Sequence, residues 1–177
     1  MCIRDRVTQG KIRYFGCSNF TAWQVCESVW TSKELGIQTF VSAQPHYSML
    51  ERNVEQELIP FCGKYGVGIL PYFPLANGFL TGKYRKDSPS PAGSRLESDN
   101  KGLFNDDNYA LLERLIKFSE DSNRTVLELA FAWLLYNKDI SSVIAGATKP
   151  EQVVANAAAA DWELTDEEYD EVTGYLS

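Results

Sequence analysis

The sequence has few of the residues from which metal sites and disulfide frameworks are built. Its 177 residues include one histidine, His46, and four cysteines that show no paired spacing. This combination argues against a zinc site, and it is typical of reduced thiols in the cytosol. We therefore expect a cytoplasmic protein without a metal site.

Basic clusters and long apolar runs are also missing. The formal net charge is −7 and the lysines and arginines form no stripe, which argues against nucleic acid as a partner. No apolar run reaches the roughly 20 residues that span a membrane. Residues 1–6 are too polar for a signal peptide. We expect neither a nucleic acid nor a membrane as a partner.

The hydrophobic residues that are present, 44% of the chain, predict a strand followed by a helix four times. The strands are expected at residues 12–15, 39–43, 67–70 and 143–145. They are apolar without alternation, which is typical of a parallel sheet with helical crossovers. Additional helices are expected at residues 109–119 and 126–136. The predicted fold class is therefore α/β.

Several expected helices begin with a capping box, in which a threonine is followed three residues later by Glu or Gln. These pairs are Thr21 with Gln24, Thr125 with Glu128, Thr148 with Glu151, and Thr165 with Glu168. A further helix is expected from residue 53 to 65, kinked or split by Pro60 and ending at Gly66. Residues 77–103 are rich in Gly, Ser, Pro and charge, which predicts a long functional loop.

The stretch at residues 142–156 predicts a site for a phosphate group. A short apolar strand is expected to turn at Gly146 into a helix that starts at Thr148, with Pro150 in its first turn. The N–H groups and the positive end of a helix dipole suit an anion. Gln152 and Asn156 lie one turn apart and could reach the same ligand. Judged alone, the stretch fits an ordinary strand-to-helix corner better than a ligand site, and the rest of the chain has to shift that balance.

Polar residues also follow the other predicted strands. Ser18 and Asn19 follow the first, Gln44 the second and Tyr72 the third. Each also has a purely structural interpretation. Ser18 and Asn19 could form a turn, Gln44 could be a buried amide with satisfied hydrogen bonds, and Tyr72 could be a core aromatic residue. Parallel α/β folds bind ligands at the carboxyl ends of their strands. The joint placement therefore favours a ligand with an amide-bearing ring and a phosphate tail, such as a nicotinamide dinucleotide.

Four segments resemble motifs of the aldo-keto reductases, in the family's order. Residues 10–20 (GKIRYFGCSNF) resemble the motif of the fifth strand and residues 44–52 (QPHYSMLER) that of the sixth. Residues 71–84 (PYFPLANGFLTGKY) resemble the seventh and residues 144–152 (IAGATKPEQ) the eighth. The similarity is greatest to the branch that includes bacterial reductases and potassium-channel beta subunits. It implies a (β/α)8 barrel that binds NADPH and reduces carbonyls.

The resemblance also implies a role for each cofactor-binding residue. Ser18, Asn19 and Gln44 would hold the nicotinamide carboxamide, and Tyr72 would stack on the nicotinamide ring. The residues expected to cover the pyrophosphate are Phe73, Pro74, Leu75, Ala76, Lys83 and Arg95. Those expected to hold the adenosine end with its 2′-phosphate are Gly146, Thr148, Gln152 and Asn156.

The catalytic group of the family is an Asp, a Tyr, a Lys and a His on its first four strands, and the four motifs found here match the last four. We therefore predict an unrelated leader at residues 1–7 and the C-terminal, NADP-binding half of a barrel at residues 8–177, without catalytic residues. One expected function is an NADP-dependent reductase of small carbonyl substrates, of which this is the cofactor-binding half. The alternative is a non-catalytic nucleotide-sensing or partner-binding module. The open edges of a half-barrel sheet predict self-association.

Overall fold

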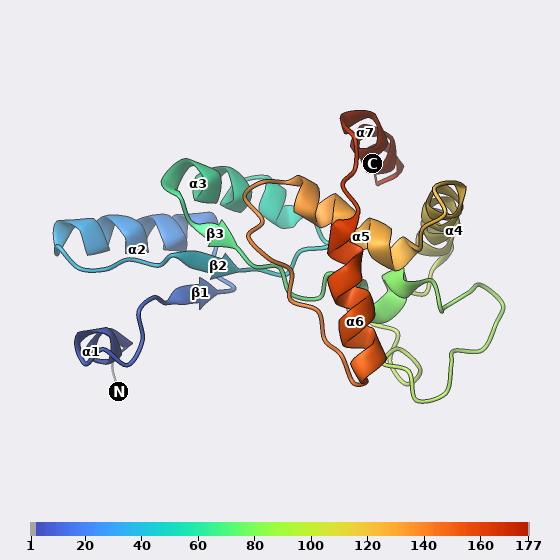
Figure 1. Cartoon of the computed structure of the whole chain (residues 1–177), viewed down its shortest axis with the longest axis horizontal. Coiled ribbons are helices and arrows are strands. Elements are labelled where there is room, and N and C mark those ends of the chain that lie inside the picture. Colours follow the sequence, from blue (N-terminus) through green and yellow to red (C-terminus); the bar gives the residue numbers. More distant parts are fainter. Residues whose placement is uncertain (1–2, 177) are drawn as a thin grey trace.

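The computed structural model describes residues 3–176 and contains one parallel sheet with the strand order β1-β2-β3. The strands are β1 (Gly16–Ser18), β2 (Ser42–Gln44) and β3 (Gly68–Ile69). Gly16 lies opposite Ser42, which lies opposite Gly68. The predictions of an α/β fold and of parallel strands are confirmed (Figure 1).

All three strands start later than the apolar pattern predicts. The predicted first and second strands include Phe15 and Phe40, whose rings pack edge to face at 5.4 Å. Regular pairing covers the residues that follow, from Gly16 and from Ser42. Apolar composition reports which side chains are buried, whereas a strand is defined by its backbone hydrogen bonds, so the two need not coincide.

The fourth predicted strand, at residues 143–145, is not a regular strand. Ile140 and Ile144 form isolated parallel bridges to Ile69 and Tyr72, and Ile144 N–H donates to the Pro71 carbonyl at 2.9 Å. The side chain of Ile144 is 40% exposed, so the prediction of a buried strand is wrong. Among the described residues the segment pairs only on its β3 side.

Helices α2 (Ala22–Glu34) and α3 (Leu58–Tyr65) follow the first two strands. The backbone N–H of Thr21 donates to Gln24 Oε1 at 2.9 Å, which confirms the predicted capping box. The predicted helix at residues 53–65 is split into a 3₁₀ turn, η1 (Asn53–Glu55), and α3, with Pro60 in the first turn of α3. Gly66 ends α3 in the left-handed conformation, with φ 68°.

The C-terminal part of the chain is helical. It contains α4 (Asp106–Asp121), α5 (Val126–Tyr136), α6 (Pro150–Ala158), the short η3 (Ala159–Asp161) and α7 (Asp166–Tyr175). Helix α5 is buried around most of its circumference, because its residues are apolar on all faces. Figure 1 shows α5 between α6 and the other helices of this part. The capping boxes at Thr125 and Thr165 are confirmed.

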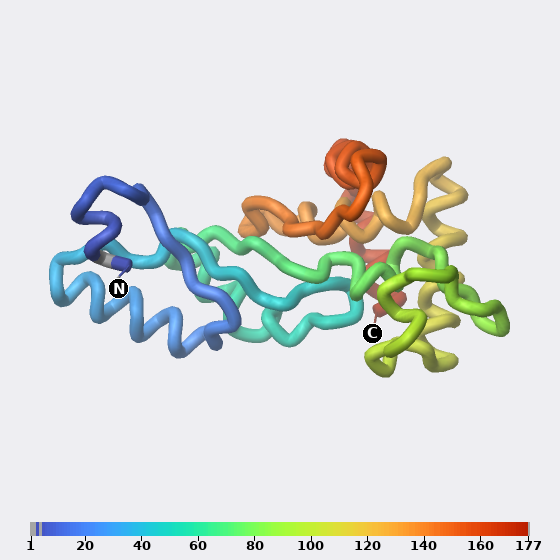
Figure 2. The backbone as a smooth tube through the Cα atoms, turned by 90° about the horizontal axis from the view of Figure 1, so that it is seen from below, coloured from blue at the N-terminus to red at the C-terminus, as the bar shows by residue number. Residues whose placement is uncertain are grey.

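The N-terminal residues 3–8 form α1 (Ile3–Thr8). In the view of Figure 2, α1 and α2 lie on opposite sides of the strands. Met1 and Cys2, which belong to the predicted leader, lie outside the described residues. The predicted domain boundary at residue 7 stays a prediction.

The predicted loop at residues 77–103 begins with a short 3₁₀ element, η2 (Ala76–Thr81), and is otherwise irregular. A cluster of aromatic rings anchors it, since Phe79 and Tyr84 stack at 6.3 Å and Tyr84 packs against Phe104 at 5.3 Å. The Tyr84 hydroxyl accepts a hydrogen bond from the backbone N–H of Leu96 at 3.2 Å. The loop is therefore held at both its start and its middle.

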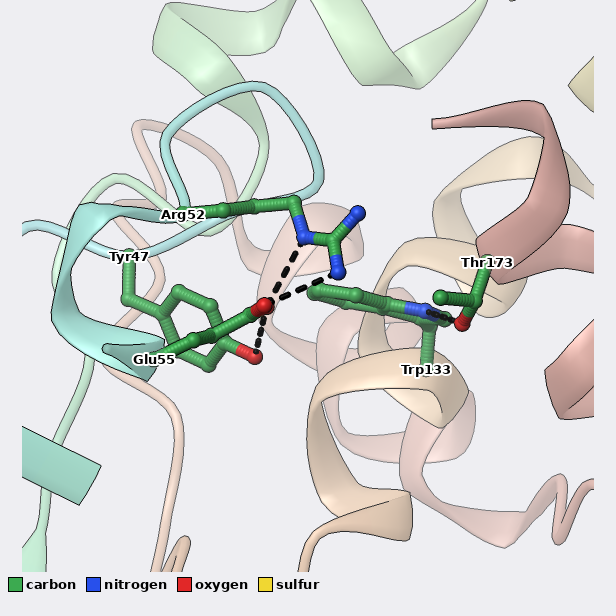
Figure 3. A network of polar contacts seen from close by, with 5 residues as sticks. All are labelled: Tyr47, Arg52, Glu55, Trp133 and Thr173. Carbon is green, nitrogen blue, oxygen red and sulfur yellow. Dashed lines mark hydrogen bonds and ion pairs between the residues drawn. The ribbon is translucent and has the colours of Figure 1, made fainter. Parts of the chain in front are cut away.

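A polar network joins the segment after β2 to α5 and α7 (Figure 3). Glu55 accepts hydrogen bonds from the Tyr47 hydroxyl at 2.9 Å and from Arg52 at 2.8 and 2.9 Å. The guanidinium of Arg52 lies 5.5 Å from the centroid of the Trp133 ring, and Trp133 Nε1 donates to Thr173 Oγ1 at 2.9 Å. Burial and, less strongly, the Glu55 carboxylate raise the pKa of Tyr47 far above its usual range.

Candidate functional site

A cavity of about 760 Å³ lies among three segments: the residues after β3, the long loop, and the start of α6. Most of the predicted cofactor-binding residues line it. These are Tyr72, Phe73, Pro74, Leu75, Lys83, Arg95, Gly146, Thr148, Gln152 and Asn156. The structure thus brings together residues that are up to 84 positions apart in the sequence, Tyr72 and Asn156.

The charge of the cavity wall differs from that of the whole chain. Lys83, Arg95 and Lys149 line the cavity, and none of the described residues that line it is Asp or Glu. The chain as a whole carries a net charge of −7. A cation in the wall of a protein cavity attracts an anion more strongly than the same cation does in bulk water. The arrangement therefore suits an anionic ligand.

The backbone beside the cavity is strained. Phe73, Ala76 and Asn77 have φ angles of 54°, 45° and 58°, in the left-handed region that side chains disfavour. Such residues cost on the order of 1–3 kcal/mol each and concentrate at binding and active sites. Phe73 is 42% exposed, and Arg95 lies 5.7 Å from the centroid of its ring. Ala76 is buried and does not line the cavity.

Ser18, Asn19 and Gln44 form a second group at the carboxyl ends of β1 and β2. The carbonyl of Gln44 accepts hydrogen bonds from Ser18 Oγ at 3.0 Å and from the N–H of Asn19 at 3.2 Å. The side-chain amide of Gln44 has no hydrogen-bond partner in the part of the chain that the structure describes. None of these three residues lines the cavity.

Tyr72 connects this amide group to the cavity. Its ring lines the cavity, and its hydroxyl donates to Asn19 Oδ1 at 2.7 Å. His46 stacks on the Tyr72 ring at 5.3 Å, with 13° between the ring planes. The predicted amide-binding residues and the cation-lined cavity are therefore neighbouring parts of one surface.

The start of α6 differs from the prediction by one residue. Lys149, and not Thr148, is the N-cap of this helix, and Pro150 occupies the first turn as predicted. Gln152 Oε1 accepts hydrogen bonds from the N–H groups of Thr148 and Lys149, at 2.7 and 3.3 Å. The predicted capping box of Thr148 with Glu151 is therefore wrong. In its place, the Gln152 side chain covers two N–H groups just before the helix.

Four polar residues of the cavity wall are absent from the predicted cofactor site: Asn77, Thr81, Ser94 and Lys149. Lys149 precedes Pro150, and its position beside a helix start was the available signal. Ser94 is surrounded in sequence by loop residues that give no such signal. Its hydroxyl oxygen is buried and has no hydrogen-bond partner among the described residues, so it can serve a ligand in the cavity.

Two of the described cysteines, Cys17 and Cys62, are buried. Cys17, Cys26 and Cys62 are free thiols, and burial raises the pKa of Cys62 to about 12. No group of three or more His, Cys, Asp and Glu side chains that could hold a metal ion occurs within residues 3–176. In the same residues no helix combines the length and the apolarity needed to cross a membrane.

Comparison with known protein families gives a match over nearly the whole chain. The model of the aldo/keto reductase family matches residues 1–176. The match includes the four motifs at residues 10–20, 44–52, 71–84 and 144–152.

Individual relatives are similar over most of this chain. A "Probable voltage-gated potassium channel subunit beta" of Oryza sativa is 36% identical over 161 residues, which cover 88% of this chain and 49% of the relative. A protein of the same name from Arabidopsis thaliana is 35% identical over 161 residues, with the same coverage. The NADH-specific methylglyoxal reductase of Escherichia coli is 36% identical over 168 residues, 93% of this chain and 48% of the relative. The chain thus spans about half the length of these relatives.

Proposed function

Since the chain belongs to the aldo/keto reductase family, we propose that it is the nicotinamide-cofactor-binding part of a carbonyl reductase, equivalent to the C-terminal half of a (β/α)8 barrel. One observation carries the proposal: a cavity with three cations and no carboxylate in its described wall adjoins, through Tyr72, a cluster of amide-binding groups. A nicotinamide dinucleotide has the matching order of groups, with an amide-bearing ring at one end and phosphates further along.

The nicotinamide ring would lie against Tyr72. One face of Tyr72 is covered by His46, and the residue lines the cavity, so a second aromatic ring can pack there with the offset geometry that such pairs prefer. Ser18, Asn19 and Gln44 would hold the carboxamide. The bound cofactor supplies the hydride, and these residues fix the face of the ring that presents it.

The phosphates would lie among Lys83, Arg95 and Lys149. Hydrogen bonds to charged groups contribute about 1.5–3 kcal/mol each, and Ser94 and the residues at 73–75 would complete the surface. Thr148, Gln152 and Asn156 line the end of the cavity beside α6, where the adenosine would lie. Because the wall is cationic, we propose NADPH as the favoured cofactor, although the relative from E. coli is named as NADH-specific.

We expect no turnover from residues 1–177 alone. Reduction of a carbonyl needs a proton donor within reach of the developing alkoxide. The Tyr72 hydroxyl is engaged in a hydrogen bond that it donates to Asn19 Oδ1. The resemblance places the catalytic Asp, Tyr, Lys and His in the half of the barrel that the four motifs do not match.

A second function is favoured by a specific observation, the similarity to two plant proteins named as channel beta subunits. In that case the chain would belong to a module that binds the cofactor in order to sense it or to recruit a partner. Both functions share the cofactor site, and a catalytic tetrad encoded upstream would favour the reductase.

Fluorescence titration of the purified chain with NADPH, NADH and 2′,5′-ADP tests the cofactor site. We expect saturable binding of all three, with NADPH tighter than NADH, and weaker binding as the salt concentration rises. The absence of saturable binding at millimolar concentrations would contradict the proposal.

A further inference from the structure

The hydroxyl of Tyr72 and the amide of Asn19 make the contact that links the two ends of the candidate site. The two residues are 53 positions apart, and the O–H of Tyr72 donates to Asn19 Oδ1 at 2.7 Å. Asn19 directly follows β1, and Tyr72 follows β3, so the bond passes over the end of β2.

Both partners are held in place by other contacts. The N–H of Asn19 donates to the Gln44 carbonyl at 3.2 Å, and Asn19 adopts a left-handed φ of 58°. The N–H of Tyr72 donates to the Pro45 carbonyl at 3.0 Å, and His46 stacks on the Tyr72 ring. The hydrogen bond therefore joins two groups whose backbones are already positioned.

A phenol bonded to an asparagine oxygen decides which way the amide faces. The amide of asparagine has an acceptor oxygen and a donor NH₂ group, and it can rotate to present either. When its oxygen accepts the Tyr72 proton, the NH₂ group is the end left for a ligand. The side-chain amide of Gln44 has no partner among the described residues and can adapt to the ligand.

We propose that the Tyr72 hydroxyl is a positioning group, which orients Asn19 as a hydrogen-bond donor toward the carboxamide oxygen of the nicotinamide. Gln44 then accepts from the carboxamide NH₂, so the pair is complementary to a primary amide. The proposal rests on the proposed cofactor function, and it adds a role for Tyr72 that is separate from ring stacking.

A double-mutant cycle on the full chain tests this role. The variants are Tyr72→Phe, which keeps the ring, Asn19→Ala, and both together. Each is titrated with NADPH and with 2′-phospho-ADP-ribose, which lacks the nicotinamide. We expect Tyr72→Phe to weaken NADPH binding about fivefold to tenfold and to leave the affinity for 2′-phospho-ADP-ribose unchanged. In the Asn19→Ala background, Tyr72→Phe should have no further effect.

Two further variants complete the design. Tyr14→Phe is the matched control, because Tyr14 is 67% exposed and belongs to neither part of the site. The aspartate in Asn19→Asp can accept a hydrogen bond from the Tyr72 hydroxyl but cannot donate one to the carboxamide. This variant should therefore lose as much NADPH affinity as Asn19→Ala.

Additive losses in the cycle, an equal loss for both ligands, or full NADPH affinity in Asn19→Asp would each overturn the positioning role. Binding of the ribose ligand shows that a variant is folded. If the unaltered chain binds neither ligand, the proposed function fails, and the positioning role fails with it. The two failures are therefore distinguishable.

Discussion

The side chains of a few residues together decide what the candidate site can bind. Lys83, Arg95 and Lys149 give the cavity its positive charge, while Tyr72 joins it to Asn19. Neither property belongs to a residue alone. A lysine on a loop is ordinarily a solvated charge. Lys83 can instead attract an anionic ligand, because no carboxylate occurs in the described wall around it.

Removal of the loop cations should weaken binding of the phosphates. Lys83→Ala and Arg95→Ala are each expected to lose about 1.5–3 kcal/mol of NADPH affinity, the contribution of a hydrogen bond to a charged group. Titration in low salt measures the loss, and Lys138→Ala is a control because Lys138 does not line the cavity. Equal behaviour of all three variants would show that the phosphates bind elsewhere.

Cys62 should control part of the alkaline stability of the chain. Burial is the main cause that raises its pKa to about 12, from about 8.5 in an unfolded chain. A raised pKa stabilises the fold fully below the unfolded value, and that contribution is lost as the pH rises from about 9 to 12. The loss is at most about 4–5 kcal/mol at 1.36 kcal/mol per pKa unit.

Urea denaturation at pH 8 and pH 10.5 measures this effect. Cys62→Ala should be less stable at pH 8, because it leaves a small cavity, but should lose less stability between the two pH values. An identical decrease in both proteins would show that other groups cause the alkaline loss.

At the scale of elements, α6 presents its N-terminal turn to the cavity. The side chain of Gln152, which belongs to this helix, caps that turn. Gln152 Oε1 accepts from the N–H groups of Thr148 and Lys149. In consequence the start of α6 offers a ligand fewer free N–H groups than the sequence suggests. Asn156, one turn further, has no such capping contact and lines the same cavity.

Substitutions at Gln152 should separate capping from binding. Gln152→Ala should destabilise the start of α6 by about 1 kcal/mol, a typical value for a lost cap. Gln152→Glu should keep the cap, gain from the helix dipole and repel the 2′-phosphate. Hydrogen exchange of the α6 amides and NADPH titration measure the two effects, with Asn156→Ala as the variant that should leave the helix start protected. Weaker protection in Gln152→Glu than in Gln152→Ala would contradict the capping role.

At the scale of the whole molecule, the sheet has two unpaired edges among the described residues. β1 pairs only with β2, and the segment at residues 140–144 pairs only with the β3 side. Large apolar side chains such as Tyr14, Trp23 and Ile144 are 67%, 62% and 40% exposed. Unpaired edges with apolar neighbours are templates for association.

We therefore expect the chain to form dimers or larger species in a concentration-dependent manner. Ile144→Lys should shift the population toward the monomer, because a charged side chain at an edge opposes strand pairing. Size-exclusion chromatography with light scattering measures the shift, and Val154→Lys is the control, since Val154 is 70% exposed and belongs to α6 rather than to an edge of the sheet. A monomer at all concentrations would rule out association through the edges.

Much of the local structure follows from the sequence alone. The pairs Thr21–Gln24, Thr125–Glu128 and Thr165–Glu168 start helices where predicted, and Gly66 ends α3 in a left-handed conformation. These interactions join residues within one turn, so the sequence determines them directly. The motifs likewise indicated the family, because they lie at the strand ends where ligand-binding residues recur.

The tertiary structure decided the features that depend on residues far apart in the sequence. The exposure of Ile144 depends on which strand lies beside it, and no pattern within residues 143–145 contains that information. The bond between Tyr72 and Asn19 needs three strands in parallel order. The positive cavity needs a loop, a helix start and a strand end to meet. Such contacts depend on packing over long separations, which local sequence does not encode.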